Sequence, residues 1–374
     1  MNFEFVSPVR VVFGNGKIKE LGKIAKPYGD KAFIVTGRNS MKKHGSLESV
    51  INSLNSQGIE SFVFDSISPN PLSDEVDQAL DLLKRDNYNV IIGLGGGSVL
   101  DASKAISAGM GYDSIRELIG GKSIDSNQYS LPVIAIPTTS GTGAEVTKGA
   151  IITDTHKGLK SGVRGLAVFP KIALVDPELT HSMPPEVTRI TGFDAFTHAV
   201  ETYVSNSSNP ITDACALQAV KYISTYLPTA IEMGHDRLAR EKMALASLMA
   251  GINIANTGTC LPHRLQQAMG SVVEMPHAAG TATLYQAWLK RAYPHAKEKF
   301  DRISEILEPE KSNSYQPIIN FMKEIGMHRS LSDFADKSQI DSFLDKVSGN
   351  LAFDPIPNID RKLMREIYEE SFKI

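Results

Sequence analysis

The stretch NVIIGLGGGSVLDASKA (residues 89–105) passes from a short apolar run into three consecutive glycines and then into a helix-like segment. Apolar runs rich in Val and Ile that end in Gly, Thr or Asp are typical of buried parallel strands. Three further runs have this form: KAFIVTG (31–37), ESFVFD (60–65) and PVIAIPTT (132–139). We therefore expect four such strands in the first half of the chain.

The segments between these runs have the pattern of helices. In SDEVDQALDLLKRDN (73–87), Val76, Leu80 and Leu83 follow helical spacing, and Ser73 is the expected N-cap. Alternating β and α segments predict a doubly wound, mostly parallel sheet with helices on both faces.

The pattern changes near MPP (183–185), where the prolines interrupt the chain. Beyond this point strand-like runs become rare. The segments expected as helices are EVTRITGFDAFTHAVETYVS (186–205), residues 206–232, residues 236–256 and the tail from Asp360. We predict an α/β domain over residues 1–183 and an all-helical domain over residues 184–374.

The composition excludes several classes of protein. The 374 residues carry a net charge of −3, without the basic excess of a nucleic-acid binder. The longest mainly apolar stretch, Met243 to Ala255, is too short to span a bilayer, and MNFEFVSPVRVVFG does not have the pattern of a secretory signal. Cys215 and Cys260 lie far apart, which is typical of a reducing compartment. We expect a cytoplasmic protein with neither a nucleic-acid nor a membrane partner.

The glycine-rich segment 93–105 has the form of a phosphate-binding turn. Glycines let a bulky anion approach the backbone, and the N–H groups of a helix that begins near Ser98 would point at phosphate oxygens. A plain glycine-rich βα turn explains the loop equally well, because a glycine cluster alone is a weak signal. The loop PTTSGTGAE (137–145) follows another strand and offers several hydroxyl groups, which suit either a ligand or its own backbone.

The segment after the second strand bears on cofactor choice. An NAD site commonly has an acidic residue at this place. This chain has Gly37, Arg38, Asn39 and Ser40 instead. Since Arg38 and Ser40 offer charge and hydrogen bonds to a 2′-phosphate, we predict a preference for NADP. The alternative is that Arg38 is a solvated loop residue.

Four side chains in the second half form a candidate metal site. Asp194 and His198 are four residues apart in a helical segment, so both lie on one face. Alone, such a pair is more often an ordinary hydrogen bond. Together with His263 and His277, however, it supplies one carboxylate and three imidazoles, a set suited to Fe(II) or Zn(II).

Taken together, the motifs GGGSVLDASK, PTTSGTGAEVT, VDPELT (175–180) and GFDAFTHAVETYVS with the two downstream histidines resemble the iron-containing (group III) alcohol dehydrogenases. This is the family of lactaldehyde reductase and NADP-dependent butanol dehydrogenase. The resemblance implies a dehydroquinate synthase-like superfold with the active site in a cleft between the two domains. It also implies one divalent metal on Asp194, His198, His263 and His277, and a homodimer.

The resemblance further assigns cofactor contacts across the first domain. These fall on Gly37, Arg38, Asn39, Ser40, Asn70, Gly96, Gly97, Ser98, Asp101, Thr138, Thr139, Thr142, Lys160 and Leu179.

One position departs from the family pattern. Four residues after the third ligand the family usually has a histidine near the substrate, and this chain has Gln267. Gln267 can contact a substrate but cannot take up a proton near neutral pH. We therefore predict no catalytic residue beyond the metal site. Arg264 is next to a ligand, but adjacent helical positions point about 100° apart, so we expect it to form a salt bridge elsewhere rather than bind an anionic substrate.

These features predict an oxidoreductase that transfers hydride between NAD(P) and a small primary or secondary alcohol, aldehyde or ketone, with the metal acting as a Lewis acid. Three alternatives stay open: a sugar-phosphate cyclase of the same superfold, a polyol (glycerol-type) dehydrogenase, and a cofactor-binding protein that lost catalysis at Gln267. Net consumption of NAD(P) separates the first alternative from a dehydrogenase, and an aldehyde-reduction assay tests the last.

Overall fold

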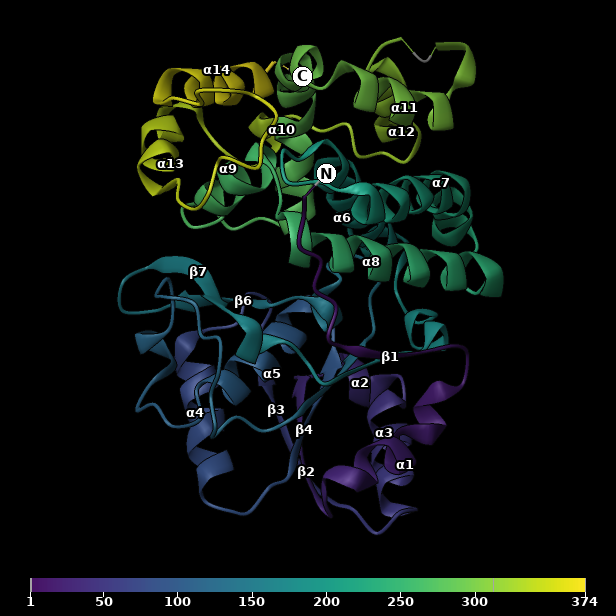
Figure 1. Ribbon diagram of the computed structural model, residues 1–374, viewed down its shortest axis with the longest axis vertical. Coiled ribbons are helices and arrows are strands. Elements are labelled where there is room, and N and C mark those ends of the chain that lie inside the picture. Colours follow the sequence, from purple (N-terminus) through teal and green to yellow (C-terminus); the bar gives the residue numbers. More distant parts are fainter. Residues whose placement is uncertain (1, 312, 374) are drawn as a thin grey trace. The chain divides into compact units, whose positions relative to one another are not determined.

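The computed structural model describes residues 2–311 and 313–373, which form two compact units (Figure 1). One unit runs from Val6 to Met183. The other contains the chain from Pro184 onward, together with a short N-terminal segment up to Phe5.

The first unit is built on a six-stranded parallel sheet with the strand order β1-β8-β5-β4-β2-β3. Its strands are β1 (Arg10–Phe13), β2 (Lys31–Gly37), β3 (Glu60–Ile67), β4 (Val90–Gly95), β5 (Val133–Pro137) and β8 (Ile172–Val175). β4 and β5 are buried along their whole length, which explains their unbroken apolar sequences. The predicted mostly parallel α/β sheet is confirmed.

Helices cover both faces of this sheet (Figure 1). The bounds of the helices in this unit are α1 (Leu21–Ala25), α2 (Ser40–Lys43), α3 (Ser46–Asn55), α4 (Ser73–Lys84) and α5 (Gly97–Ala108). α1 and α3 pack against one face with Ala32 and Ile34, whereas α4 and α5 pack against the other with Phe33 and Val35. Successive residues of β2 therefore serve opposite cores, as the two-residue repeat of a strand requires. At their carboxyl ends the strands lead into loops.

Four features of this unit differ from the sequence expectation. The hairpin of β6 (Gly149–Asp154) and β7 (Leu159–Arg164) is antiparallel and was not predicted, because β6 alternates half-buried and buried residues instead of forming an apolar run. The edge strand β1 and strand β8 were not predicted either. The prediction that Ser73 is an N-cap is wrong: Leu72 holds that position, and the Glu75 carboxylate accepts its N–H at 3.2 Å.

The second unit is helical. Its helices are α6 (Pro185–Val204), α7 (Pro210–Glu232), α8 (Arg237–Thr257), α9 (Leu261–Met269), α10 (His277–Ala292), α11 (Lys297–Leu307), α12 (Gln316–Glu324), α13 (Ile340–Lys346) and α14 (Arg361–Ser371). α6 packs against α7, α8 and α10, and its residues from Gly192 to Val204 are all buried. Polar residues on α6 therefore lie inside the core.

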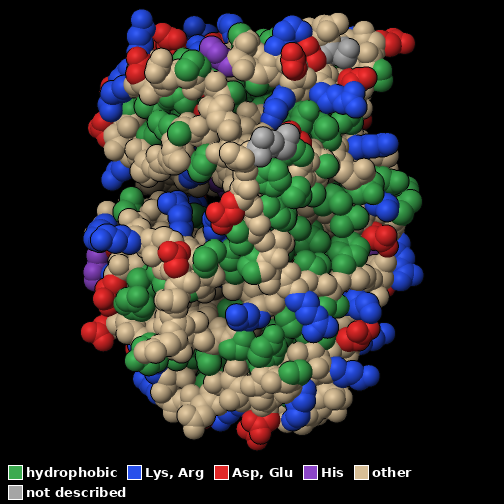
Figure 2. Space-filling model, viewed as in Figure 1, with side chains coloured by type: hydrophobic (Ala, Val, Ile, Leu, Met, Phe, Trp, Pro, Cys, Tyr) green, Lys and Arg blue, Asp and Glu red, His purple; other side chains and the backbone are tan. Residues whose placement is uncertain are grey.

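On the face in Figure 2, basic and acidic side chains are interspersed, and apolar side chains gather over α7 and α8. No single helix of the described chain is both long and apolar enough to cross a membrane; α8 and α9 pass that test only as a pair, with a 95° bend between them.

Candidate metal centre and cofactor loops

Three helices of the second unit carry the predicted metal ligands. Asp194 and His198 lie one turn apart in the buried middle of α6. His263 lies in the first turn of α9, where Pro262 occupies a position that needs no backbone donor. His277 is the first residue of α10.

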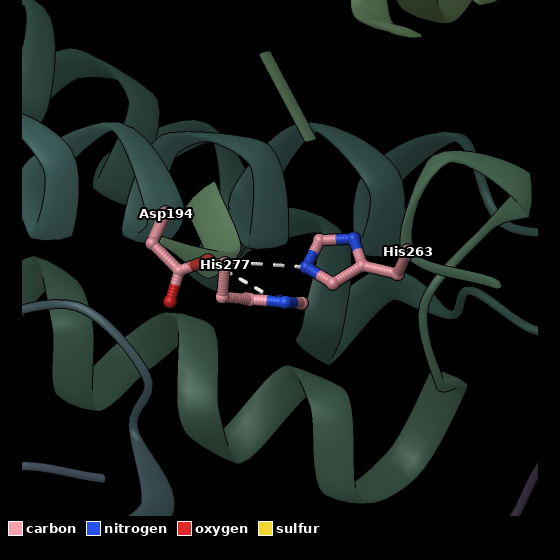
Figure 3. A group of neighbouring side chains, drawn as sticks. All are labelled: Asp194, His263 and His277. Atoms are coloured by element: carbon pink, nitrogen blue, oxygen red, sulfur yellow. Dashed lines mark ion pairs between the residues drawn. The ribbon is translucent and has the colours of Figure 1, made fainter. Parts of the chain in front are cut away.

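The structure brings three of these side chains together (Figure 3). One ligand atom each of Asp194, His263 and His277 lies within 4.8 Å of the other two. Oδ1 of Asp194 is 4.0 Å from Nε2 of His263 and 3.8 Å from Nε2 of His277. Both imidazoles therefore direct the same nitrogen at one carboxylate oxygen.

Two atoms of this group have unmet bonding capacity. Oδ1 of Asp194 and Nε2 of His263 are fully buried, and neither has a hydrogen-bond partner among the described residues. Leaving buried polar atoms unsatisfied costs free energy unless something else binds them. A divalent cation would satisfy both atoms, and a carboxylate with imidazoles is a donor set that Fe(II) and Zn(II) accept. The residues present thus fit the implied metal.

His198 lies beside this three-residue group. Its ring stacks on that of His263, with centroids 4.7 Å apart and planes 26° from parallel. Its Nδ1 is 3.9 Å from Oδ2 of Asp194. His198 is close enough to complete a four-ligand set, although it is not one of the three converging groups.

Two residues that were not predicted from the sequence contact the Nδ1 atoms of the His263 and His277 rings, on the side away from Asp194. Both carboxylate oxygens of Glu201 lie 2.8 Å from Nδ1 of His263, and Oε1 of Gln266 contacts Nδ1 of His277. With each Nδ1 engaged, each Nε2 is directed at Asp194. The available signal was weak: Glu201 follows Asp194 by seven residues, two turns along the same helix.

Burial dominates the electrostatics of this cluster. Burial raises the pKa of the Glu201 carboxyl to about 8, against the opposing effect of His198. Burial, followed by His198, lowers the pKa of His263 well below its usual value. A neutral His263 is the form that can bind a cation through a nitrogen lone pair.

Gln267 is linked to the preceding turn of α9. Nη1 of Arg264 donates to Oε1 of Gln267 at 3.2 Å, and Nη2 of Arg264 donates to Oγ1 of Thr259 at 3.1 Å. With its oxygen engaged, Gln267 offers its amide N–H groups as donors.

The predicted cofactor residues lie in the α/β unit, and several come together at the carboxyl ends of β4 and β5. α5 begins at Gly97, directly after β4. A Cβ on Gly97 would be 2.6 Å from Cγ2 of Thr142, and one on Gly96 would be 3.3 Å from Cγ2 of Thr139. The glycines therefore let the loop after β5 approach the start of α5 closely, which is a packing reason in addition to any ligand.

Asn70, Ser98 and Lys160 form a second part of this region. The backbone N–H of Asn70 donates to Oγ of Ser98 at 3.3 Å, and Nζ of Lys160 donates to Oδ1 of Asn70 at 2.6 Å. Asn70 has a φ of 60°, a left-handed conformation that non-glycine residues rarely adopt. Burial lowers the pKa of Lys160, and the nearby Asp101 opposes this effect.

A fully buried lysine, Lys104, holds Asp101 and the neighbouring backbone in place. Nζ of Lys104 pairs with Oδ1 of Asp101 at 3.0 Å and donates to the carbonyls of Ala144 and Gly149. The other oxygen of Asp101 accepts the N–H of Ile151 at 3.0 Å. Asp101, a predicted cofactor contact, is thus fixed from two sides. Thr138, another such contact, is buried.

The remaining cofactor residues lie at other strand ends. Gly37 ends β2, Asn39 precedes α2 and Ser40 begins it. The Arg38 side chain is 68% exposed, and its Nη2 is 3.8 Å from Oε1 of Glu75. Leu179 is buried in a 3₁₀ turn against the core that includes β5 and β8.

Comparison with known families gives matches along nearly the whole chain. Residues 8–177 match the family model described as iron-containing alcohol dehydrogenase. Residues 188–372 match the C-terminal model of the Fe-containing alcohol dehydrogenase family.

Comparison with individual proteins points to the same family. The chain is 36% identical to the NAD-dependent methanol dehydrogenase of Bacillus methanolicus over 73% of this chain and 71% of that protein. It is 29% identical to the NADPH-dependent butanol dehydrogenase of Clostridium saccharobutylicum over 98% of this chain and 97% of that protein. A solved iron-containing alcohol dehydrogenase from Thermotoga maritima is similar with a TM-score of 0.89, at 34% identity and complete coverage of both chains.

Proposed function

This chain belongs to the iron-containing alcohol dehydrogenase family, and from that membership we propose that it exchanges hydride between NADP and a small alcohol at a bound divalent cation. That it is an NAD(P)-dependent alcohol oxidoreductase follows from the family. The preference for NADP, the metal ligands and the substrate are our proposals.

The observation that carries the metal site is the pair of buried atoms, Oδ1 of Asp194 and Nε2 of His263, that have no hydrogen-bond partner in the described part of the chain. We assign the cation to Asp194, His198, His263 and His277. When bound, such a cation supplies Lewis-acid chemistry that lowers the pKa of an alcohol oxygen. Nicotinamide supplies the hydride acceptor.

The residues of the chain position the cation and orient the groups that bind it. Asp194 provides an anionic oxygen, and the two imidazoles present Nε2 because their Nδ1 atoms contact Glu201 and Gln266. Gln267 donates a hydrogen bond to the substrate but holds no titratable proton. We propose that the cofactor ribose, when bound, and ordered water would provide the route by which the proton leaves.

The NADP preference rests on the end of β2. Gly37 has no side chain where an acidic residue would repel a 2′-phosphate, and the exposed Arg38 side chain is free to turn toward one. The relatives include both NAD-dependent and NADPH-dependent enzymes, so the family alone does not decide.

The test is a panel of alcohols and aldehydes assayed with NADP and NAD, on protein reconstituted separately with Fe(II) and Zn(II). We expect turnover with small primary or secondary alcohols that depends on added metal, and a higher kcat/KM with NADP. Metal-independent turnover would refute the metal role, and a strong preference for NAD would refute the cofactor assignment.

The sugar-phosphate cyclase alternative is not favoured, because the matching families and relatives are alcohol dehydrogenases. Net consumption of NADP during turnover is the distinguishing readout, since a cyclase regenerates its nicotinamide.

Location and assembly are proposals too. A cytoplasmic location is supported by the free thiols of Cys215 and Cys260, because disulfides are typical of oxidising compartments. A homodimer is supported by the exposed apolar side chains Ile211, Met233 and Leu238, since exposed apolar surface often marks an interface. Light scattering of the purified protein tests it: a monomer would refute the dimer.

A further inference from the structure

We propose that Glu201 is a positioning residue of the metal centre, which fixes both the ring of His263 and the start of the helix that carries it. This inference rests on the proposed metal site. The sequence offered no assignment for Glu201, and the family resemblance placed no role on it.

Glu201 makes two kinds of contact with one carboxylate. Its two oxygens each lie 2.8 Å from Nδ1 of His263, and Oε2 also accepts the backbone N–H of Cys260 at 2.8 Å. Cys260 is the N-cap of α9, three residues before the ligand. Glu201 is fully buried, so water does not compete for these bonds.

The contacts define which nitrogen of His263 faces the cation. A neutral imidazole has one N–H donor and one lone pair. When Nδ1 donates to the carboxylate, the lone pair is on Nε2, the atom that lies 4.0 Å from Oδ1 of Asp194. Carboxylate partners of this kind fix the ring and strengthen metal binding in other proteins.

The effect of Glu201 extends to a second ligand. Gln266, whose Oε1 contacts Nδ1 of His277, lies on α9 one turn after His263. α9 therefore provides one ligand directly and orients another. By holding the N-cap of α9, Glu201 influences both imidazoles.

Asp354 offers a matched comparison. It is also a buried carboxylate, and its Oδ2 accepts the N–H of Leu261 at 2.7 Å and Nε1 of Trp288 at 2.9 Å. It thus holds the same end of α9, one residue further along the chain, and among the described residues its carboxylate makes no hydrogen bond to a histidine ring. A role confined to the helix end predicts equal effects of Glu201 and Asp354, whereas an additional role at the ring predicts a larger effect of Glu201.

The experiment compares Glu201→Gln with Asp354→Asn, two exchanges of a buried carboxylate for a carboxamide. The metal-free proteins are titrated with Zn²⁺ against a chromophoric chelator, and circular dichroism checks that each variant is folded. We expect Glu201→Gln to weaken zinc binding by about 10–100-fold, and Asp354→Asn, which disturbs the helix end but not the ring of His263, to weaken it less. In zinc-loaded, ¹⁵N-histidine-labelled protein, the Nδ1–H signal of His263 should shift only in Glu201→Gln.

Wild-type zinc affinity in folded Glu201→Gln, or an equal loss in Asp354→Asn, would overturn the proposal. If Glu201→Gln does not fold, Glu201→Asp replaces it: this variant keeps the carboxyl group but withdraws it from the ring, so zinc affinity should fall, and wild-type affinity would overturn the proposal. Failure of the wild-type protein to bind one zinc would instead refute the metal site itself, and the role of Glu201 with it.

Discussion

Replacing Glu145 with Gln should stabilise the protein increasingly as the pH rises. Glu145 lies in the short 3₁₀ turn Ala144–Val146 that closes the loop after β5, and it is 3% exposed. Burial raises the pKa of its carboxyl from 4.5 to about 7, against the opposing effects of a backbone hydrogen bond and Lys104.

The sign and size follow from proton linkage. The folded protein holds the Glu145 proton more tightly than the unfolded chain, so the contribution to stability is full below pH 4.5 and is lost as the pH rises to about 7. At about 1.4 kcal/mol per pH unit, that interval corresponds to about 3 kcal/mol. About 2 kcal/mol of this falls between pH 5 and pH 8. Gln has a similar shape and does not ionise, so Glu145→Gln avoids the loss.

The assay is urea unfolding of both proteins at several pH values between about 5 and 8. The difference in free energy of unfolding, variant minus wild type, should grow by about 2 kcal/mol across this range. Glu48→Gln, at an exposed position on α3, is the control and should show no such trend. A constant difference for Glu145→Gln would refute the reasoning, because it would mean that the buried carboxyl does not titrate in this window.

Three other variants test the site. His263→Ala should abolish both bound metal and turnover, measured by elemental analysis and activity; turnover retained after the metal is lost would contradict the mechanism. Gly97→Ala places a methyl group 2.6 Å from Cγ2 of Thr142 and should weaken NADPH binding about tenfold through overpacking; Gly149→Ala, whose nearest neighbour would be 4.0 Å away, is the control, and equal affinities in fluorescence titration would contradict this. Arg38→Ala should lower the NADP-to-NAD ratio of kcat/KM by about tenfold, since a charged hydrogen bond contributes about 1.5–3 kcal/mol; an unchanged ratio would show that Arg38 is a solvated loop residue.

The fold was predictable where a strand is buried along its length, because burial then leaves a continuous apolar run in the sequence. Strands β2, β4 and β5 are buried on both faces, so their apolar runs are continuous and easily recognised. β6 and β7 form a separate antiparallel pair with half-buried positions, and no apolar run distinguishes them from a loop. The edge strand β1 has two exposed and two half-buried residues, for the same reason.

The metal site was predictable only in part. The four-residue spacing of Asp194 and His198 is a local helical pattern, but the approach of His263 and His277 depends on how α9 and α10 pack against α6. A single sequence does not encode that packing in any short pattern, and the family resemblance supplied it. Glu201 was missed because it acts on the far side of a ring, through a contact that spans 62 positions of sequence.

The most direct test of the metal centre is X-ray absorption at the zinc edge of the zinc-loaded protein. We predict a first shell of nitrogen and oxygen at about 2.0–2.1 Å, with no sulfur near about 2.3 Å. Outer-shell scattering should correspond to three imidazoles, and to two in His198→Ala. Fewer imidazoles in the wild type, or the same number in wild type and His198→Ala, would contradict the four-ligand site.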